Sequence, residues 1–139
     1  MSEPEVLARV SADRPDRAAL EEFVMTAADG ALVAFEGVVR DHDHGEAVTA
    51  LDYEAHPDAE RFLADACREI ARETGLRVAA WHRVGALAVG DVALLAVVAA
   101  PHRADAFAAC ARLVDRIKES TPIWKRQHLE SGTTEWVGL

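Results

Sequence analysis

Residues 76–100 read LRVAAWHRVGALAVGDVALLAVVAA, and this stretch decides the fold class. It contains two segments rich in apolar residues, 76–84 and 91–100, separated by a short segment that begins and ends with glycine. Glycine accommodates the backbone conformations of tight turns, so the pattern predicts two strands with a short connection. The second segment is apolar along most of its length, which indicates a strand buried on both of its faces.

Further strands are expected on both sides of this stretch. Residues 31–40 alternate between two faces, and a returning strand follows over 48–55 after the polar loop 41–46. This arrangement predicts a long-looped antiparallel hairpin. Shorter strands are expected at 6–10, 123–129 and 133–137.

Three helices are expected between these strands, over about 13–28, 57–75 and 103–120. Gly75 ends the second helix, and Pro122 forbids continuation of the third because proline lacks the backbone donor. Hairpins with interspersed helices predict an α+β fold with a mainly antiparallel sheet and about three helices. The chain shows no repeat or linker, so residues 1–139 are expected to form a single domain.

Composition and charge exclude several classes of protein. The net charge of -9 argues against a uniform nucleic-acid-binding surface, since phosphate binding requires a basic footprint. The longest apolar run, residues 92–100, is far shorter than the ~20 residues that span a bilayer. Residues 1–5 are acidic and lack the pattern of a signal peptide. We therefore expect a cytoplasmic protein.

The basic residues are unevenly distributed along the chain. Residues 102–127 carry a net charge of +3, against -12 for the rest, which suits a small anion such as a phosphate ester. Of the 15 cationic residues, only Lys118 and Lys125 are lysines, and they lie on either side of Pro122. Lysine can lose its proton or act as a nucleophile, whereas arginine cannot. The alternative is a chance pair of lysines on a solvated face.

Three further positions are candidates for binding. His102 and Arg103 precede the third predicted helix, where backbone donors and the helix dipole favour an anion, although an ordinary helix start is the alternative. Arg40 ends a strand at a polar loop, where binding groups are common. Trp124 lies beside two cations and would be either an apolar anchor that directs them or a core tryptophan.

Other potentially reactive residues fit structural roles. Residues 42–44 read His-Asp-His but have no third ligand at a recognisable spacing, so a solvated loop is expected rather than a metal site. His82 lies within a predicted strand and is expected to be structural. Cys67 and Cys110 lie on apolar helix faces and are expected to be core thiols. No metal or cofactor is expected.

Several stretches together resemble the catalytic (large) subunit family of molybdopterin synthase. Their order and spacing resemble the family's from about residue 30 to residue 137. The specific combination is a His-Arg pair, a helix ending in lysine and a Pro-x-Trp-Lys-Arg tract. The matching stretches are GALVAFEGVVR (30–40), HRVG (82–85), Gly90-Asp91, His102-Arg103, Ala106-Phe107, DRIK (115–118), PIWKR (122–126) and Trp136-Val137.

The resemblance implies an α/β-hammerhead-like fold and a sulfur transfer in molybdenum cofactor biosynthesis. The family's substrate is cyclic pyranopterin monophosphate (precursor Z), and two sulfurs are installed to form the molybdopterin dithiolene. The donor is the C-terminal Gly-Gly thiocarboxylate of a small ubiquitin-like carrier subunit. The family assembles as a homodimer of large subunits within a heterotetramer, so a pocket near the dimer interface would draw on both chains. Neither nucleic acid nor membrane is an expected partner.

The resemblance also implies which residues act. Lys118 and Lys125 match the family's two active-site lysines. The implied substrate-binding positions are Val38, Val39, Arg40, His102, Arg103, Arg126 and Gln127.

Two features depart from the family's pattern. Gln127 stands where the family commonly has glutamate, and the chain stops at Leu139, where relatives often continue. Two other interpretations stay open at this point. One is a non-catalytic domain that binds an anion, and the other is a subunit that only docks a ubiquitin-like protein.

Overall fold

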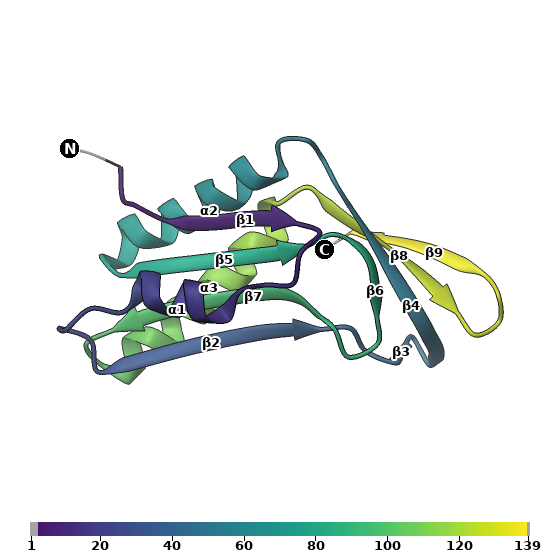
Figure 1. The fold of residues 1–139 in the computed structure, drawn as a ribbon, viewed down its shortest axis with the longest axis horizontal. Helices are drawn as coiled ribbons and strands as arrows, with labels where there is room; N and C mark the ends of the chain where they lie inside the picture. Colours follow the sequence, from purple (N-terminus) through teal and green to yellow (C-terminus); the bar gives the residue numbers. More distant parts are fainter. Residues whose placement is uncertain (1–2, 139) are drawn as a thin grey trace.

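The computed structural model describes residues 3–138. The expectations about the two chain ends involve Met1, Ser2 and Leu139, which lie outside the described residues. The helices are α1 (Arg17–Val24), α2 (Ala59–Thr74) and α3 (Arg103–Ser120). The strands are β1 (Leu7–Ser11), β2 (Ala31–Val38), β3 (His42–Asp43), β4 (Glu46–Ala55), β5 (Arg77–Arg83), β6 (Gly85–Ala88), β7 (Val92–Ala100), β8 (Ile123–Leu129) and β9 (Thr134–Gly138). The α+β fold with a mainly antiparallel sheet and three helices is confirmed (Figure 1).

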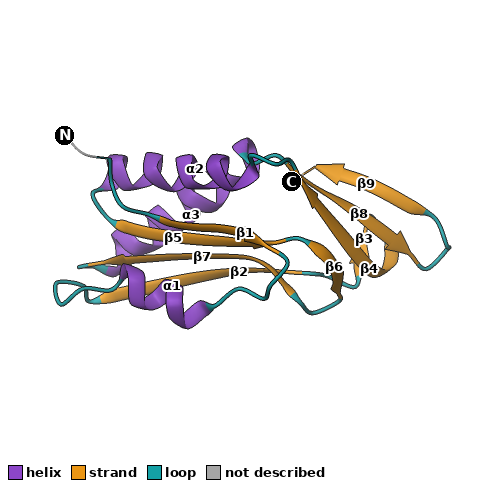
Figure 2. Cartoon of the chain, turned by 45° about the horizontal axis from the view of Figure 1, so that its top comes forward, coloured by secondary structure: helices purple, strands orange, loops and turns teal. Residues whose placement is uncertain are grey.

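The first sheet has the strand order β1-β5-β7-β2, and only the β1–β5 pair is parallel. Helices α2 and α3 cover one face, and the short helix α1 covers the other (Figure 2). Strand β7 lies inside this sheet, and all its residues from Ala93 to Ala100 are buried. The prediction of a strand buried on both faces is therefore confirmed.

The second sheet contains β3, β4, β8 and β9 in that order, with β6 paired to β4, and it forms the other end of the molecule (Figure 1). The predicted hairpin between 31–40 and 48–55 is wrong, because β2 pairs with β7 in the first sheet and β4 pairs with β8 in the second. A shift in register at Gly37–Val38 ends the β2 pairing, and a tight turn at His44–Gly45 pairs only the two residues of β3 with β4. The connection 85–90 also contains an unexpected strand, β6.

Helices α2 and α3 agree with the prediction, and Gly75 ends α2 in the left-handed conformation with φ of 71°. Helix α1 is shorter than predicted. The side chain of Asp16 accepts a hydrogen bond from the backbone N–H of Ala19, and this N-cap fixes the start. At the other end, the Asp29 side chain accepts a hydrogen bond from the Thr26 backbone N–H and holds a turn where helix was expected. None of the described helices combines the length and apolar character needed to cross a bilayer.

The largest hydrophobic cluster lies between the first sheet and helices α2 and α3. It includes Ile70, Leu113 and Ile117, which are fully buried, and burying one such side chain stabilises the fold by about 1.5–3 kcal/mol. Cys67 and Cys110 belong to this cluster, and burial raises the pKa of their thiols to about 12 and about 11. The prediction of core thiols is confirmed. This packing also fixes the C-terminal end of α3 against the first sheet.

Candidate active site

A hollow of about 340 Å³ lies where the two sheets meet. We call it the lysine pocket. It is lined by residues from β2 and its end, β4, β5, β7, α3 and β8, so segments far apart in the sequence converge on it. The lining residues are Phe35, Gly37, Val38, Arg40, Tyr53, His82, Ala93, Leu94, Lys118 and Lys125.

The two lysines of the chain meet in this pocket. Lys118 lies in the last turn of α3, which ends where the backbone N–H of Thr121 donates to the carbonyl of Ile117 at 3.0 Å. Lys125 lies on β8, whose side chains alternate between two faces of the sheet. Ile123 shares the face of Lys125 and is buried in a second hydrophobic cluster, which anchors the strand. The break at Pro122 therefore turns the chain so that both amines reach one hollow.

Trp124 does not belong to the core. Its side chain is 44% exposed and lies on the face of β8 opposite to Lys125. The alternative of a core tryptophan is therefore wrong. Arg126 shares the face of Trp124, where it pairs with Asp52 at 3.2 Å and stacks over Trp136. Arg126 thus lies outside the lining of the lysine pocket.

Neither lysine forms an ion pair with any residue that the structure describes. Burial lowers the pKa of the Lys125 ammonium, and the positive charges of Arg40 and Lys118 act in the same direction, against the charge of Asp43. A lowered pKa makes the neutral amine more accessible than it is in an exposed lysine. Lys125 is partly buried and Lys118 is exposed, and unpaired cations that share a hollow are typical of a site that binds an anion or transfers a proton.

Asp43 and Gln127 lie behind the lining of the lysine pocket, and Asp43 is near Arg40 and Lys125. The Gln127 side-chain amide donates to the Asp43 carboxylate at 2.8 Å, and this hydrogen bond lowers the pKa of Asp43. Arg40 lies 3.5 Å from the same carboxylate. A glutamate at position 127 would repel Asp43, whereas glutamine donates a hydrogen bond to it. Asp43, expected in a solvated loop, therefore belongs to the surroundings of the site.

His82, expected from the sequence to be structural, lines the lysine pocket. It is only 2% exposed, and its Nδ1 lies 2.8 Å from the carbonyl oxygen of Arg83. Burial lowers the pKa of His82 to about 4, and the charge of Lys118 adds to this, so the ring is neutral near pH 7. The alternation of β5 directs His82 toward α3, but its meeting with Lys118 depends on long-range packing that the sequence pattern does not show.

The MoaE protein family model matches residues 10–120. The chain belongs to this family. The molybdopterin synthase catalytic subunit of Staphylococcus carnosus is 43% identical over 119 residues, which cover 84% of this chain and 79% of that protein. A structure of molybdopterin synthase from Staphylococcus aureus superposes with a TM-score of 0.84 at 34% identity, covering 100% of this chain and 99% of that one. A complex of subunits 1 and 2 of molybdopterin-converting factor from Helicobacter pylori contains a chain of the same fold, with a TM-score of 0.62 at 19% identity, covering 80% and 72% of the two chains.

Besides Arg126 and Gln127, three positions carried over from the MoaE family lie outside the lining of the lysine pocket of a single protomer. His102 and Arg103 are exposed at the N-terminal end of α3. Arg103 lies fifteen residues before Lys118, which corresponds to about 22 Å along a helix. Val39 is buried, and its backbone N–H and carbonyl are already bonded to Asp91 and Gly90.

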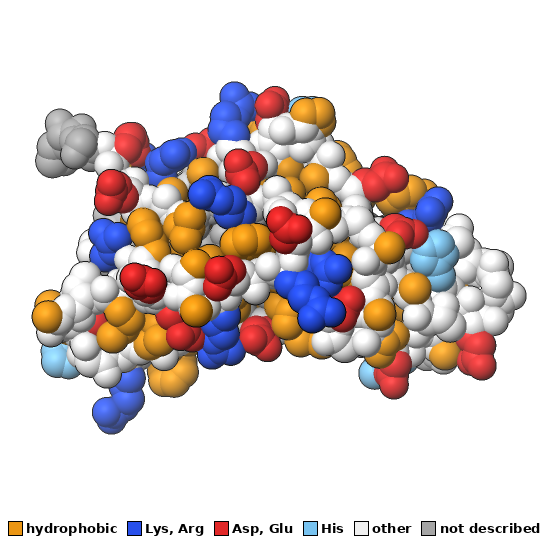
Figure 3. Space-filling view, viewed as in Figure 1, with side chains coloured by type: hydrophobic (Ala, Val, Ile, Leu, Met, Phe, Trp, Pro, Cys, Tyr) orange, Lys and Arg blue, Asp and Glu red, His pale blue; other side chains and the backbone are white. Residues whose placement is uncertain are grey.

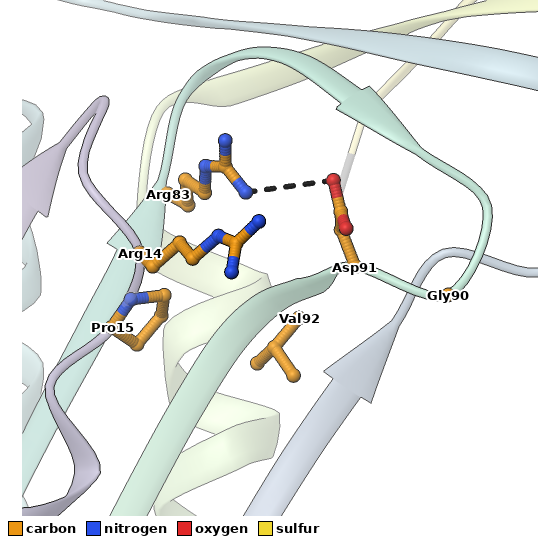
Figure 4. Close-up of a pocket in the computed structure, with 6 residues that line it drawn as sticks. All are labelled: Arg14, Pro15, Arg83, Gly90, Asp91 and Val92. Carbon is orange, nitrogen blue, oxygen red and sulfur yellow. Dashed lines mark hydrogen bonds and ion pairs between the residues drawn. The ribbon is translucent and has the colours of Figure 1, made fainter.

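A second hollow, of about 290 Å³, lies near the opposite face of the first sheet in this MoaE-family chain. We call it the arginine pocket. Figure 4 shows the Arg14 and Arg83 side chains next to each other, with the Asp91 carboxylate across from them. Arg83 lies 3.5 Å from Asp91 and also donates to the carbonyl of Ala12. A group of basic side chains is visible near the middle of this side of the molecule, where acidic and basic residues are otherwise interspersed (Figure 3).

Among the described residues, no group of three or more His, Cys, Asp or Glu side chains is placed to hold a metal ion. His42 pairs with the neighbouring Asp41 and is exposed, in agreement with a solvated loop.

Proposed function

We propose that this chain is the catalytic subunit of a molybdopterin synthase. It would transfer sulfur from the C-terminal thiocarboxylate of a small ubiquitin-like carrier to precursor Z. The observation that carries the proposal is the convergence of Lys118 and Lys125, with Arg40, in one pocket of a MoaE-family chain. The relatives named molybdopterin synthase catalytic subunit support the same activity.

The chemistry is an exchange of sulfur for oxygen. The thiocarboxylate sulfur forms a bond to a carbon of the pterin side chain as a carbon–oxygen bond at that carbon breaks. Hydrolysis of the resulting thioester then breaks the acyl carbon–sulfur bond, and water supplies the oxygen of the carboxylate that the carrier carries away. Negative charge on sulfur and oxygen develops during this exchange, and cations already positioned along the pocket stabilise it. Lys118 would act nearest the reacting atoms, as proton donor or acceptor or as a transient acyl acceptor. Lys125 would hold the carrier's tail or the pterin.

One protomer places three cations in the lysine pocket, and one of them, Arg40, already lies 3.5 Å from the Asp43 carboxylate. Arg40 is available there, whereas His102 and Arg103 lie at the far end of α3. We propose that these two residues act in the pocket of a second copy of the chain. Within the described part of the chain, β2 pairs along only one of its edges. Exposed apolar side chains lie on β2 and the neighbouring α3, namely Leu32, Phe35 and Phe107.

A two-fold axis at the β2 edge would set the two α3 helices antiparallel. The N-terminal end of one α3 would then lie near the C-terminal end of the other, so that the partner's Arg103 approaches Lys118. The two sites of the homodimer would each use residues from both protomers. This arrangement predicts that substitutions at the two ends of α3 complement each other.

The complementation experiment mixes Lys118→Ala and Arg103→Ala chains by co-expression. If the site is shared, random pairing restores about a quarter of the wild-type activity, because half of the dimers are mixed and each has one intact site. If each pocket is built from one chain, Arg103→Ala alone keeps its activity, because Arg103 lies far from Lys118 in its own chain, and the mixture shows only the average of the two single variants. Size-exclusion chromatography with light scattering checks that both variants still dimerise.

The decisive test of the activity is reconstitution. The purified chain is mixed with thiocarboxylated carrier and precursor Z, and molybdopterin is detected by mass. Product formation supports the proposal, and its absence with fully thiocarboxylated carrier overturns it. The two simpler interpretations predict other results. A non-catalytic anion-binding domain binds precursor Z without moving sulfur, and a docking subunit binds the carrier with equal affinity whether or not both lysines are replaced.

A further inference from the structure

The polar side chains that line the lysine pocket are mostly donors. Arg40, Lys118 and Lys125 carry only hydrogen-bond donors, and no lining residue is Asp or Glu. The Tyr53 hydroxyl can donate or accept. A pocket with cations alone would attract any phosphate ester, so selection of one substrate requires an additional group of different character.

His82 supplies that group because its tautomer is fixed. A carbonyl oxygen only accepts, so Nδ1, which lies 2.8 Å from the Arg83 carbonyl, carries the proton. In the neutral ring, Nε2 then has a free lone pair and is an obligatory acceptor. No described residue makes a hydrogen bond to this atom. The ring itself is immobilised, since it is 2% exposed and packs edge-on against Tyr53 with a centroid separation of 5.0 Å.

We propose that His82 Nε2 is a substrate-orienting acceptor, which receives a hydrogen bond from an N–H or O–H group of the phosphorylated heterocycle. The inference rests on the proposed function of the lysine pocket and adds a specificity-determining residue to it. The cations hold the anionic groups of the substrate, and His82 selects the orientation in which a donor meets Nε2. A site that hydrogen-bonds a donor discriminates strongly against an analogue without it, because the buried acceptor is then left unpaired.

Two substitutions separate the two nitrogens of the ring. In His82→Asn, the side-chain amide can still donate to the Arg83 carbonyl, but nothing remains at the position of Nε2. In His82→Gln, an amide group reaches the position of Nε2. We expect His82→Asn to raise KM for precursor Z about tenfold, which corresponds to the loss of one hydrogen bond of about 1.4 kcal/mol, with the Kd for the carrier unchanged. His82→Gln should recover part of this loss.

A measurement on the wild-type chain reports the tautomer of His82 directly, and a variant is needed only to assign the signal. With ¹⁵N-labelled histidine, the long-range ¹H–¹⁵N spectrum separates protonated from unprotonated ring nitrogens, and His82→Asn identifies the signal of residue 82. We expect His82 in the Nδ1–H form, with the Nε2 resonance moving upfield when precursor Z is added and staying unchanged with inorganic phosphate. A purely structural histidine would show no change specific to the heterocycle.

The possible outcomes distinguish this inference from the proposed function. If the wild-type chain makes product while His82→Asn has an unchanged KM and Nε2 does not move, the role of His82 is wrong and the activity stands. If precursor Z binds and shifts Nε2 but no sulfur moves, the acceptor role is supported and the activity is wrong. If precursor Z does not bind at all, both are wrong.

Discussion

The lysine pocket and the arginine pocket lie near the same junction between the sheets, and both contain two or more cations. The two pockets differ in how these cations are paired. In the arginine pocket, Arg83 is satisfied by the Asp91 carboxylate and the Ala12 carbonyl. Asp91 in turn accepts from the backbone N–H of Ala88, so this set ties the β6–β7 turn to the end of β5. In the lysine pocket, Lys118 and Lys125 have no ion-pair partner among the described residues.

The difference shows that the number of basic residues does not identify the functional hollow. Arg83 is paired with a carboxylate and contributes to structure, whereas Lys125 is unpaired and partly buried, which has a free-energy cost that a ligand can relieve. The lysine pocket also places a neutral buried histidine beside its cations, and the arginine pocket contains no titratable group with a comparable environment. We therefore expect substitutions in the lysine pocket to affect turnover and those in the arginine pocket to affect stability.

The largest expected effect is on turnover. Lys118→Ala should reduce kcat by about 10²- to 10⁴-fold, the range for loss of a positioned acid–base or nucleophilic group. Lys118→Arg should lower kcat as well if Lys118 exchanges a proton during the reaction, because arginine keeps its proton. The matched control is Arg14→Ala, which removes an exposed cation from the arginine pocket and should change kcat less than about twofold. Equal losses in Lys118→Ala and Arg14→Ala would remove the distinction between the pockets.

The second prediction concerns stability in acid. The pKa of His82 is about 4 in the folded chain and near 6.5 when exposed, so the unfolded chain binds more protons between these values. Stability therefore rises with pH through this window and is lost as the pH falls from 6.5 to 4, by up to about 3 kcal/mol for a shift of this size. Urea unfolding at several pH values measures it.

The control for this prediction is the His82→Asn variant, which lacks the titrating ring. The stability difference between the wild type and this variant should narrow toward pH 4, because acidic side chains common to both chains cancel in the difference. A constant difference across the window would mean that His82 is not held neutral by its surroundings.

Local patterns in the sequence are sufficient to predict much of this molecule. The apolar run of β7, the glycine that ends α2 and the proline that follows α3 act over a few residues, and the structure confirms the elements they predict. The spacing of Lys118 and Lys125 around Pro122 left a chance pair on a solvated face open, and only the family resemblance implied that both lie in one site. The prediction of a β2–β4 hairpin was wrong because the polar loop between the two segments does not show that β2 pairs with β7 and β4 with β8.

The rest of the site depends on long-range packing. Tyr53 reaches the pocket because β4 pairs with β8, and His82 reaches it because β5 pairs with β7, against which α3 packs. No pattern within β5 distinguishes a histidine that faces the core from one that faces a pocket. For His102 and Arg103 the prediction came from the family resemblance, which assigns both residues to the site. Within one chain, however, the length of α3 separates them from Lys118.

A smaller effect is expected in the arginine pocket itself. Asp91→Asn keeps a side-chain acceptor for the Ala88 N–H but removes the charge that pairs with Arg83. A partly exposed ion pair contributes about 0.5–1 kcal/mol, so the free energy of unfolding should fall by about that amount. The kcat of the folded variant should stay within about twofold of the wild type. A large loss of turnover at unchanged stability would assign the arginine pocket a direct role in the reaction.

The smallest expected effect is a gain in stability at Lys125. Its pKa is lowered mainly by burial, so the folded chain holds the charged amine at a cost at neutral pH. Lys125→Met removes this charge with little change in volume, and the thermal midpoint at pH 7 should be equal to or slightly above that of the wild type, while activity is lost. The folded pKa lies below the unfolded value of 10.5, so the unfolded chain binds more protons as the pH approaches it. The wild type should therefore gain stability relative to Lys125→Met with rising alkalinity, and the two midpoints should converge. A variant that is clearly less stable at pH 7 would show that Lys125 serves the structure, as Arg83 does.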